Sequence, residues 1–565
     1  MNLFTKAKLT YDFIKWRLTW DRRNTHYRFT VPGNGRFMGP RDAVKLIPDG
    51  AVVGLTGLGA NMRASIMYWA IREVFEETGH PRGLTLLCPG GFGGRGRVPG
   101  TPEELGVEGL CTRLFTGHTE TFKSLLRLAD KGKLELQCIP QGTFILLLAA
   151  MAEGEDAFVT ETGTGTVIDP RVGRGTPVLN VGPQYVHAEN GGLRYTCPKL
   201  DVAVFNAPAA DRKGNLYVKR AAMIGESREM AKAAKRNGGL VIANVGKIVD
   251  EGYDEIFLPA EEVDAIVYYP KTEQTGSKYH RRPLKMLTTE SNLRLDEGLA
   301  RVRFVNRLVG VTPKRSEVDA VVARLAATVF AEHLRKGALV NFGVGMPEEV
   351  SRLLFDSGLF IDMTGFTESG VFGGVAAPGI FFGAGINPTE IVSSAETFRR
   401  MYRHLDATVL GFLQVDSDGN VNVSKRGEGA INYVGPGGFI DITTCAQHVF
   451  FVGAWMANAR FGLANGGIRV EQPGPVKFIE RVDEITFNGR EALKRGQKVF
   501  YITQVGAFRL TDRGMELFRV MPGIDVRRDV LDVTPMKVAL PEDDRVPVVD
   551  ASVITGRGLR LSLPA

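Results

Sequence analysis

Short apolar runs that end at glycine turns alternate with amphipathic segments along this chain. GALVNF (337–342) reads as a buried strand, and the GVG turn after it leads into PEEVSRLLF (347–355). In that second segment apolar residues recur at helical spacing, Pro347 stands near the first helical position and acidic residues fill the first turn. The order of strand, glycine turn and helix predicts an α/β domain with backbone N–H groups at a helix N-terminus, where an anion or a polarised carbonyl can bind. SGLFIDM (357–363) reads as a further apolar strand.

Two patterns occur twice, in the same order. DGAVVGLTGLGA (49–60) matches KGALVNFGVGMP (336–347), and KLDVAVFNAPAADRKGNLYV (199–218) matches HLDATVLGFLQVDSDGNVNV (404–423). Each member of the longer pair reads as a strand, a D-x-x-G-N hairpin turn and a second strand. The sequence therefore predicts two duplicated open α/β domains, with the active site in the cleft between them.

The boundary between the two domains is predicted near VTPKRSEVD (311–319). Pro313 interrupts the chain there, and Ser316 with Asp319 resembles a capping box at the start of a helix. With 565 residues the chain is too long for one ordinary domain. We predict one domain at 41–312 and a second at 313–565.

Residues 1–40 form a basic, aromatic-rich extension. We expect a helix packed on the body or on a partner subunit. A helix on a membrane surface and a transit peptide are the alternatives, although Asp12 and Asp21 count against a transit peptide.

Composition narrows the class of protein. The net charge is +7, which suits an anionic ligand but is too diffuse to indicate nucleic acid. The five cysteines include no C-x-x-C pair, so we expect idle thiols in a reducing compartment and a cytoplasmic protein. No apolar run approaches the ~18 residues of a membrane span.

Most catalytic motifs are missing from the chain. It has no GxxxxGK[ST], HExxH or GxSxG, and no paired-cysteine metal site. GFGGRG (91–96) satisfies G-x-G-x-x-G, but Pro99 and Pro102 follow where the helix of a dinucleotide site should run. A structural or ligand-facing glycine loop is the favoured interpretation.

One carboxylate remains, in FTESGVFGGVAAPG (366–379). Glu368 has no basic neighbour in sequence and is surrounded by small residues. A solitary glutamate is usually a solvated surface group. Here it follows an apolar run, and open α/β sheets bind ligands at strand carboxyl ends. The glycines would let a bulky substrate approach the backbone closely.

The segments NFGVGMPEEV, FTESGVFGGV, FFGAGINPTEIV, DGNVNVSK and GPGGFIDIT resemble the family I CoA-transferases, and most closely the fused acetate/propionate type. EETGHPRGLTLL, PQGTF and TGTVIDPR of the first half are similar as well, so the resemblance covers about residues 41–540. It implies that Glu368 is acylated and then carries CoA as a glutamyl thioester. For the oxyanions it implies backbone donors at Gly437 and Gly438, in GPGG, together with the amide of Gln141. The CoA-binding residues that it implies are Gly343, Val344, Gly345, Met346 and Asn387.

The chemistry suits this residue type. A glutamate with its ordinary pKa of ~4.3 is ionised at neutral pH and needs no base to attack a thioester. CoA and acyl-CoA are substrates, and neither a metal nor a prosthetic group is required. An acyl-CoA hydrolase that uses the same intermediate and a non-catalytic CoA-binding protein are the alternatives. The resemblance further suggests a homo-oligomer, a dimer or a tetramer, with carboxylic acids as the other substrates.

The residues around Glu368 bear on the choice of acyl group. Phe366, Phe372, Phe381 and Phe382 flank the glutamate where the family often has smaller residues. We therefore expect an apolar acyl pocket for a small or medium monocarboxylate. Without a dedicated cation, such a pocket should disfavour dicarboxylates.

Overall fold

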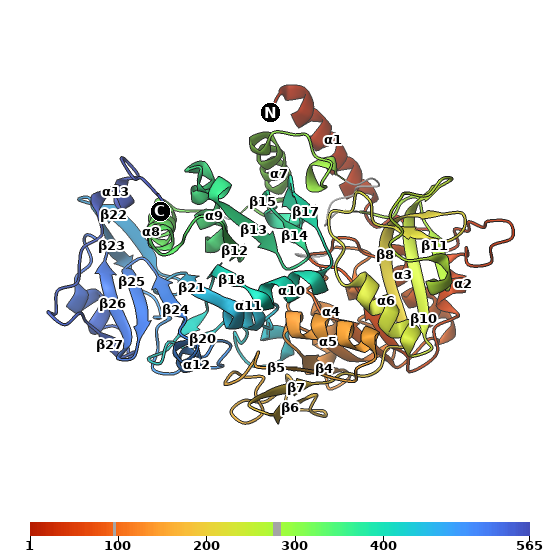
Figure 1. Cartoon of the computed structure of the whole chain (residues 1–565), viewed down its shortest axis with the longest axis horizontal. Helices are drawn as coiled ribbons and strands as arrows, with labels where there is room; N and C mark the ends of the chain where they lie inside the picture. The colour runs from red at the N-terminus through yellow and green to blue at the C-terminus, as the bar shows by residue number, and fades with distance from the viewer. Residues whose placement is uncertain (94–97, 275–283, 313, 565) are drawn as a thin grey trace.

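The computed structural model describes residues 1–93, 98–274, 284–312 and 314–564. Two large sheets define two halves that lie side by side (Figure 1). We call residues up to 312 the first half and residues from 314 the second half. The last strand of the first sheet ends at Tyr268, and the first strand of the second sheet begins at Ala338. The predicted boundary falls in the helical segment between these two residues. The boundary itself stays a prediction, because Pro313 lies outside the described residues.

The sheet of the first half is parallel except for β9, and its order is β11-β10-β8-β1-β2-β3-β4. Its strands are β1 (Val52–Leu55), β2 (Leu84–Cys88), β3 (Cys111–Thr116), β4 (Glu135–Cys138), β8 (Val202–Asp211), β9 (Leu216–Tyr217), β10 (Leu240–Val249) and β11 (Ala265–Tyr268). The helices are α1 (Leu3–Thr19), α2 (Pro40–Val44), α3 (Ser65–Thr78), α4 (Lys123–Asp130), α5 (Gln141–Glu153), α6 (Ser227–Arg236) and α7 (Leu295–Val309). A separate small sheet contains β5 (Phe158–Thr160), β6 (Val186–Glu189) and β7 (Gly192–Tyr195).

The sheet of the second half has a parallel centre, β13-β12-β18-β21-β24, with antiparallel pairs on both sides. Its strands are β12 (Ala338–Phe342), β13 (Met363–Thr367), β14 (Val371–Phe372), β17 (Glu390–Ile391), β18 (Leu405–Leu410), β21 (Ala446–Val452), β24 (Lys498–Ile502), β25 (Gly506–Thr511), β26 (Gly514–Val520) and β27 (Val538–Ala539). Small two-stranded sheets pair β15 (Val375–Ala376) with β16 (Gly385–Ile386), β19 (Gln414–Val415) with β20 (Val421–Asn422), and β22 (Arg460–Ala464) with β23 (Gly467–Gln472). The helices are α8 (Glu317–His333), α9 (Met346–Asp356), α10 (Ser394–Arg403), α11 (Phe439–Cys445), α12 (Gly489–Lys494) and α13 (Ala551–Thr555).

The two halves repeat the same local arrangement, which confirms the predicted duplication. Strand β1 lies between β8 and β2, and β12 lies between β18 and β13. An aspartate tethers the first strand of each half in the same way. The N–H of Val52 donates to Asp201 Oδ2 at 2.8 Å, and the N–H of Leu339 donates to Asp406 Oδ2 at 2.8 Å.

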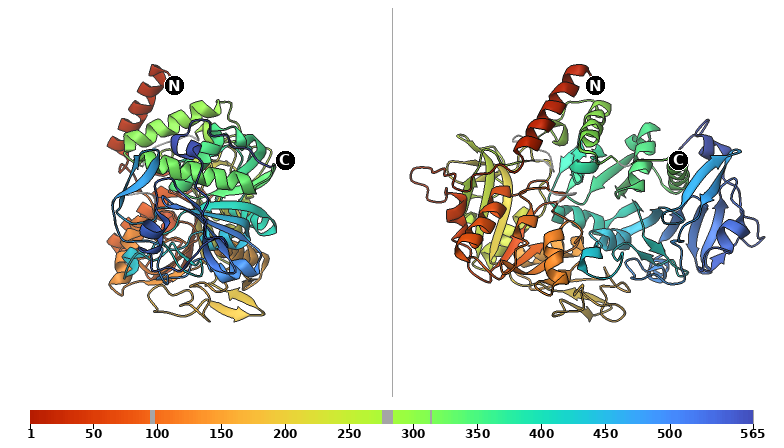
Figure 2. Two further views of the ribbon diagram at one scale, coloured as in Figure 1. Left: turned by 90° about the vertical axis from the view of Figure 1, so that its left-hand side faces the viewer. Right: turned by 180° about the vertical axis from the view of Figure 1, so that it is seen from behind.

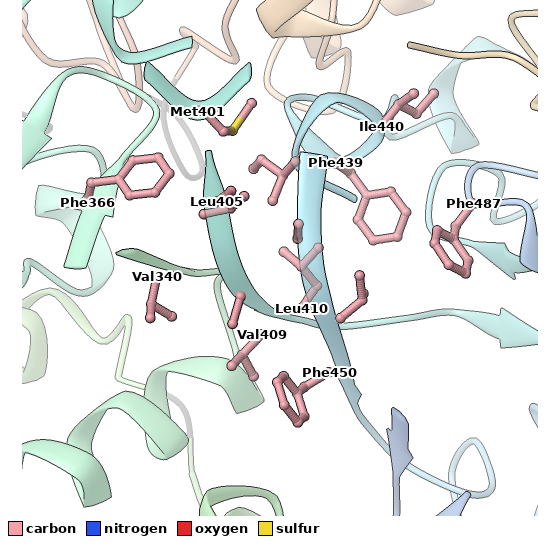
Figure 3. Packing of buried hydrophobic residues seen from close by; sticks show 14 of the residues in the cluster. Val340, Phe366, Met401, Leu405, Val409, Leu410, Phe439, Ile440, Phe450 and Phe487 are labelled. Carbon is pink, nitrogen blue, oxygen red and sulfur yellow. The ribbon is translucent and has the colours of Figure 1, made fainter. Parts of the chain in front are cut away.

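The central strands of the second half are buried on both faces, as expected of parallel strands with continuous apolar sequence. Strand β18 is buried along its whole length. Figure 3 shows side chains of the neighbouring elements packed around β18, among them Phe366, Met401 and Phe450. Fully burying such a side chain contributes about 1.5–3 kcal/mol, so the strands that lead to the site are held firmly.

One predicted strand is wrong in its position. SGLFIDM (357–363) contains a short 3₁₀ turn, Leu359–Asp362, and the strand β13 begins only at Met363. Gly358 ends the preceding helix with a positive φ of 82°, and Ile361 is 92% exposed. The apolar run therefore belongs partly to the surface, and Glu368 follows a strand that starts later than predicted.

A smaller prediction was confirmed. The N–H of Asp319 donates to Ser316 Oγ at 3.1 Å and the N–H of Ser316 donates to Asp319 Oδ2 at 2.9 Å, which is the capping box at the start of α8. The N-terminal extension begins with the helix α1, whose Trp16 is buried against the body. In the part of the chain that the structure describes, no helix has both the length and the apolar character needed to cross a membrane.

Candidate active site

Glu368 is the first residue after β13, at the carboxyl end of a strand beside the centre of the second sheet. Its side chain lines two cavities. The interdomain cavity, of about 470 Å³, is walled by both halves and includes Gln141 and Gly438. The α7 cavity, of about 200 Å³, extends towards α7 and α9. Glu368 therefore stands where two openings meet, at the sheet edge where α/β proteins bind ligands.

The GPGG loop fastens the two halves together beside Glu368. The N–H of Gln141 donates to the carbonyl of Gly437 at 2.8 Å, and the N–H of Gly437 donates to the carbonyl of Gly117 at 2.7 Å. A Cβ added to Gly438 would lie 3.4 Å from Glu368 Cδ, so this glycine lets backbone and carboxylate meet closely. Its N–H makes no hydrogen bond to any residue that the structure describes.

The structure therefore divides the roles expected of the two glycines. The N–H of Gly437 is already used by Gly117 and cannot also face an oxyanion in this arrangement. The N–H of Gly438 remains available beside Glu368. The loop is bound to the other half through Gly437 and offers a backbone donor beside Glu368 at Gly438.

Gln141 begins α5 and brings its side chain from the first half into the interdomain cavity. Its amide lies between two glycines: the Nε2 atom is 3.8 Å from a Cβ added to Gly90, and Oε1 is 3.9 Å from one added to Gly437. The side chain is 4% exposed. Gln141 and Gly438 thus line one cavity with Glu368, although the sequence separates them by about three hundred residues.

Asp441 is the buried group that holds this arrangement in place. It lies on α11 of the second half and caps the N-terminus of α5 in the first half. Its carboxylate accepts from the N–H groups of Gly142 (2.9 Å) and Thr143 (2.7 Å) and from the hydroxyl groups of Thr143 (2.8 Å) and Tyr402 (3.0 Å). Because α5 begins at Gln141, this cap fixes the residue whose side chain enters the cavity.

Two carboxyl groups of the second half, the partly buried Glu368 and the fully buried Asp441, have raised pKa values. Burial, and secondarily the nearby negative charge of Asp441, raises the pKa of Glu368 to about 7. Burial also raises the pKa of Asp441 to about 6, against the four donors that favour its ionised form. The expectation of an ordinary glutamate pKa was therefore wrong. The carboxylate of Glu368 is therefore more basic than an exposed one.

The α7 cavity is lined by arginines that no motif in the sequence indicated. Arg303 and Arg307 lie four residues apart on α7, are exposed, and line this cavity together with Glu368. Neither has an ion pair among the described residues. Arg352 of α9 also lines it, but is paired with Glu349 at 3.0 Å. The expectation that the acyl pocket lacks a dedicated cation concerns that pocket alone and stays a prediction.

The residues expected to contact CoA fall into two groups. Gly343 and Val344 line both cavities beside Glu368, and Gly345 with Met346 continues that loop into the first turn of α9. Asn387 lies apart from both cavity linings. Its Nδ2 donates to the carbonyl of Leu293 at 2.6 Å, and its amide is engaged in holding a neighbouring loop. A CoA contact at Asn387 stays a prediction.

Only one of the four phenylalanines lines these cavities. Phe382 is on the wall shared by both. Phe366 and Phe372 are a cross-strand pair with ring centroids 5.4 Å apart and are nearly buried, and Phe381 is fully buried in a separate core cluster. Phe366 and Phe372 pair with each other across β13 and β14, and Phe381 lies in a 3₁₀ turn, so only Phe382 contributes to these cavity walls. The apolar acyl pocket for a monocarboxylate stays a prediction.

The glycine loop after β2 contributes part of the wall. Gly91 lines the interdomain cavity, which supports the ligand-facing interpretation of GFGGRG, although residues 94–97 lie outside the described residues. Asp441 was missed in the sequence. The signal was a lone acid in the apolar run GFIDIT, since a buried carboxylate needs dedicated donors.

Comparison with known proteins supports this arrangement. Residues 37–268 match the family model "Coenzyme A transferase". The chain is 32% identical over 523 residues to the caffeate CoA-transferase of Acetobacterium woodii, covering 90% of this chain and 95% of that protein. It is 30% identical over 515 residues to the acetate CoA-transferase YdiF of Escherichia coli, covering 88% and 92%. The chain belongs to the coenzyme A transferase family, and it is a CoA-transferase.

Solved structures show the same two-domain architecture. The acyl-CoA transferase YdiF apoenzyme from Escherichia coli O157:H7 superposes with a TM-score of 0.81 and 27% identity, over 95% of this chain and 99% of that chain. A thioester complex of YdiF with CoA gives a TM-score of 0.80 and 26% identity, over 93% and 97%. The predicted cytoplasmic location and the homo-oligomeric state stay predictions.

Proposed function

We propose that this enzyme moves CoA from an acyl-CoA to a free carboxylate through a thioester on Glu368. The observation that carries the proposal is the position of this carboxylate. It lies where two cavities meet, beside a backbone donor, and without a cation bound to it in the described structure. A related enzyme, YdiF, has been solved as a thioester complex with CoA, which supports the same type of intermediate here.

The raised pKa of Glu368 suits a nucleophile. Its ionised oxygen attacks the thioester carbon, the C–S bond breaks, and CoA leaves as a thiolate while Glu368 becomes a mixed anhydride. The thiolate then attacks the Glu368 carbonyl carbon, the bond to the acyl oxygen breaks, and the first acid leaves as a carboxylate. A second carboxylate reverses these steps. Each step exchanges one activated acyl bond, a thioester or an anhydride, for another, and no step uses water. The cycle therefore conserves the thioester bond.

Both halves contribute to the oxyanions of these steps. The backbone N–H of Gly438 and the amide of Gln141 line the cavity that holds Glu368. Donors placed where charge develops are each worth about 2.7–4 kcal/mol in other enzymes. Asp441 acts through Gln141, by capping α5, and is a positioning residue.

The charges of the two cavities orient the substrates. Arg303 and Arg307 complement the phosphate groups of CoA, so we assign the α7 cavity to the CoA arm. The interdomain cavity then holds the acyl group and the acceptor acid. Its volume of about 470 Å³ allows acids larger than acetate. The caffeate CoA-transferase among the relatives is in keeping with a bulky acyl group, whereas the YdiF enzyme is named for acetate.

The intermediate can be trapped. Incubation with acetyl-CoA in the absence of an acceptor acid should add the mass of CoA less water to the intact protein, and peptide mapping should place it on Glu368. Glu368→Gln should abolish both the adduct and the exchange. An adduct that survives in Glu368→Gln would show that the nucleophile is another residue.

Glu120→Gln is a matched control, because Glu120 lines the same cavity but is ion-paired with Arg426. This variant should keep the adduct. The same assay with and without added acid separates the possible activities: acid-dependent exchange indicates a transferase, and release of thiol without acid indicates a hydrolase. An enzyme that releases CoA equally fast in both conditions would contradict the proposed transferase.

A further inference from the structure

The helix α1 exposes an apolar stripe on the side that faces away from the body. Leu3, Phe4, Tyr11, Ile14 and Leu18 are 81, 78, 62, 50 and 70% exposed. Positions 4, 7, 11, 14 and 18 follow a spacing of three and four residues, so they form one continuous line along the helix. The first eighteen residues thus hold a large share of the exposed large hydrophobic side chains described for the chain.

The opposite face of the same helix packs on the protein. Trp16 is 3% exposed, and Leu9 packs with the cluster that α7 forms with the second half. Figures 1 and 2 show α1 leaning on α7 and projecting beyond the rest of the molecule. The helix therefore has two apolar faces, and the body covers only one of them.

Basic residues border the exposed stripe on both sides. At 100° per residue, Lys8 and Lys15 lie along one edge of the stripe and Lys6 and Arg17 along the other. All four side chains are exposed. The outward face of α1 therefore offers an apolar line to lipid chains, and its lysines and arginine are placed to reach anionic headgroups.

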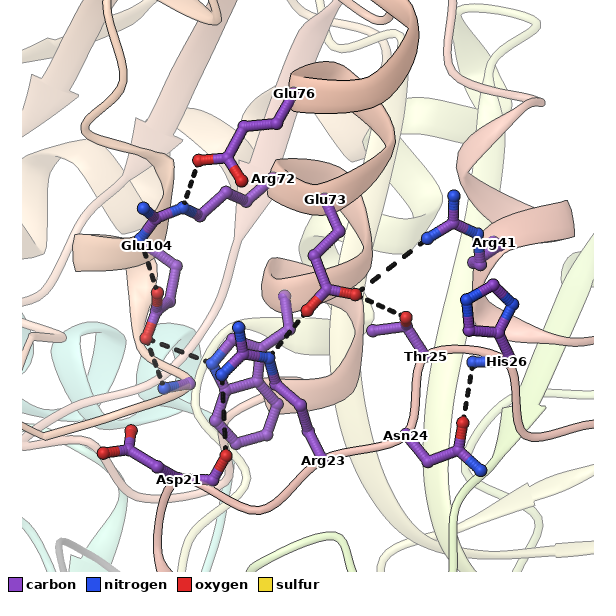
Figure 4. Close-up of polar contacts among 12 residues, drawn as sticks. Asp21, Arg23, Asn24, Thr25, His26, Arg41, Arg72, Glu73, Glu76 and Glu104 are labelled. Atoms are coloured by element: carbon purple, nitrogen blue, oxygen red, sulfur yellow. Dashed lines mark hydrogen bonds and ion pairs between the residues drawn. The ribbon is translucent and has the colours of Figure 1, made fainter.

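The segment after α1 is fastened to the body, which holds the helix in a defined place. Arg23 Nε donates to Glu73 Oε1 at 2.8 Å, and Thr25 Oγ1 donates to Glu73 Oε2 at 2.5 Å (Figure 4). Glu73 lies on α3, whose Arg72 pairs with Glu104. The stripe is consequently presented on a rigid base and not on a loose tail.

Two observations favour an anionic lipid surface over a second copy of the chain. Pairing two stripes would bring rows of like charge together, at a cost in free energy. A helix of about 25 Å also offers too little area to reach the ~1,200–2,000 Å² of a stable interface. A lipid surface satisfies both features, since acyl chains take the stripe and anionic headgroups take the cations.

We infer that α1 is a membrane-surface anchor, and that this CoA-transferase docks on anionic lipid through the stripe of Phe4, Tyr11, Ile14 and Leu18 and its flanking cations. The helix lies on the surface and does not span it. This inference does not depend on the catalytic mechanism. A failure of docking would leave exchange activity in solution intact, and a failure of the proposed mechanism would leave docking intact.

The test is sedimentation of the full-length enzyme with vesicles of phosphatidylcholine alone and of phosphatidylcholine with phosphatidylglycerol. We expect binding to the anionic vesicles that weakens as salt rises. Phe4→Ser/Tyr11→Ser/Ile14→Ser/Leu18→Ser should lose binding, and Lys8→Ser/Lys15→Ser should lose about 25-fold, or about fivefold per cation. Val172→Ser/Ile361→Ser removes exposed apolar side chains elsewhere and should bind like the wild type.

Three results of the vesicle experiment would overturn the inference. The first is no binding of the wild type to anionic vesicles, and the second is equal binding by the wild type and the stripe variant. The third is binding that changes neither with salt nor with replacement of the two lysines. Light scattering should give the same oligomeric state for the wild type and the stripe variant. A stripe variant that dissociates an oligomer would show that a second copy covers the stripe. Thermal unfolding and solution activity of each variant confirm that the fold is kept.

Discussion

The two halves of this enzyme use the same strand ends for different purposes. Val53 pairs with Leu86 of β2 and Val202 of β8, and Val340 pairs with Gly365 of β13 and Ala407 of β18. Pro89 follows Leu86 by three residues, and Glu368 follows Gly365 by three residues. Pro89 therefore occupies in the first half the position that Glu368 occupies in the second.

The surroundings of these two positions differ as well. In the first half, a Cβ added to Gly57 would lie 1.8 Å from the ring of Phe92, so the loops there are packed against each other. In the second half, the corresponding loops leave Glu368 open to two cavities. Duplication supplied two equal frameworks. The first half forms a packed wall that carries Gln141. The second half has the open space and the carboxylate that covalent chemistry needs.

The largest expected effect separates the two equivalent positions. Glu368→Gln removes the nucleophile and should lower kcat for CoA exchange by about 10⁴-fold or more. Pro89→Ala changes the matching position of the first half and should cost less than tenfold. Steady-state exchange between acetyl-CoA and propionate measures both. Comparable losses in the two variants would mean that the halves share the chemistry.

The contribution of the first half is measured through Gln141. Gln141→Ala removes the amide from the cavity and should lower kcat by about 10²–10³-fold with little change in either KM, as for other oxyanion donors. Gln141→Glu puts a negative charge there and should be worse than alanine. A change confined to KM would assign Gln141 to substrate binding instead.

Replacing the arginines of α7 tests whether the α7 cavity binds CoA and the interdomain cavity binds the acids. Arg303→Ser/Arg307→Ser should raise KM for acyl-CoA by about 3–30-fold, because charge-assisted contacts to phosphate at an exposed site are lost. KM for the acceptor acid should stay the same. Arg294→Ser, at the N-cap of the same helix but paired with Asp296, is the control. If the acceptor KM rises instead, these arginines recognise an acid substrate, and dicarboxylates become the acids to test.

Asp441 couples the halves, and its replacement tests that coupling. Asp441→Asn removes a negative charge near Glu368, so the pKa of Glu368 should fall from about 7 and the rising limb of kcat/KM with pH should move to lower pH. The amide also presents a donor to the N–H groups that the carboxylate accepted, so kcat should fall about tenfold. A purely structural role would lower activity without moving the limb, and Asp441→Glu should restore part of the rate.

The smallest effect concerns stability. The pKa of Glu368 is higher in the folded protein, about 7, than the ordinary 4.5, so the folded state binds this proton more tightly. Wild-type stability relative to Glu368→Gln should therefore fall as pH rises from about 4.5 to about 7. At pH 8 the glutamine variant should be more stable by about 1–3 kcal/mol, and at pH 4 the two should agree. Chemical denaturation at both values measures this. A glutamine variant that is less stable at pH 8 would contradict the raised pKa.

The sequence by itself determined the features that depend on neighbouring residues. Apolar runs, glycine turns and the D-x-x-G-N hairpins predicted the duplicated α/β halves, and FTESG marked Glu368 as the group to examine. These signals are local, because hydrogen-bond periodicity and turn geometry are set within a few residues. The late start of β13 shows where prediction from local patterns fails. An apolar run does not reveal which of its residues the fold exposes.

Only the tertiary structure decided how the site is completed. Asp441 caps α5 from 298 residues away, and the N–H of Gly437 is taken by a carbonyl of the other half. The raised pKa of Glu368 is also a tertiary effect, because the burial of this side chain and the nearby charge of Asp441 exist only in the folded protein. Arg303 and Arg307 likewise reach the cavity through the placement of α7 and not through any motif. Contacts of this kind depend on distances across the cleft, and no periodicity along the chain encodes them.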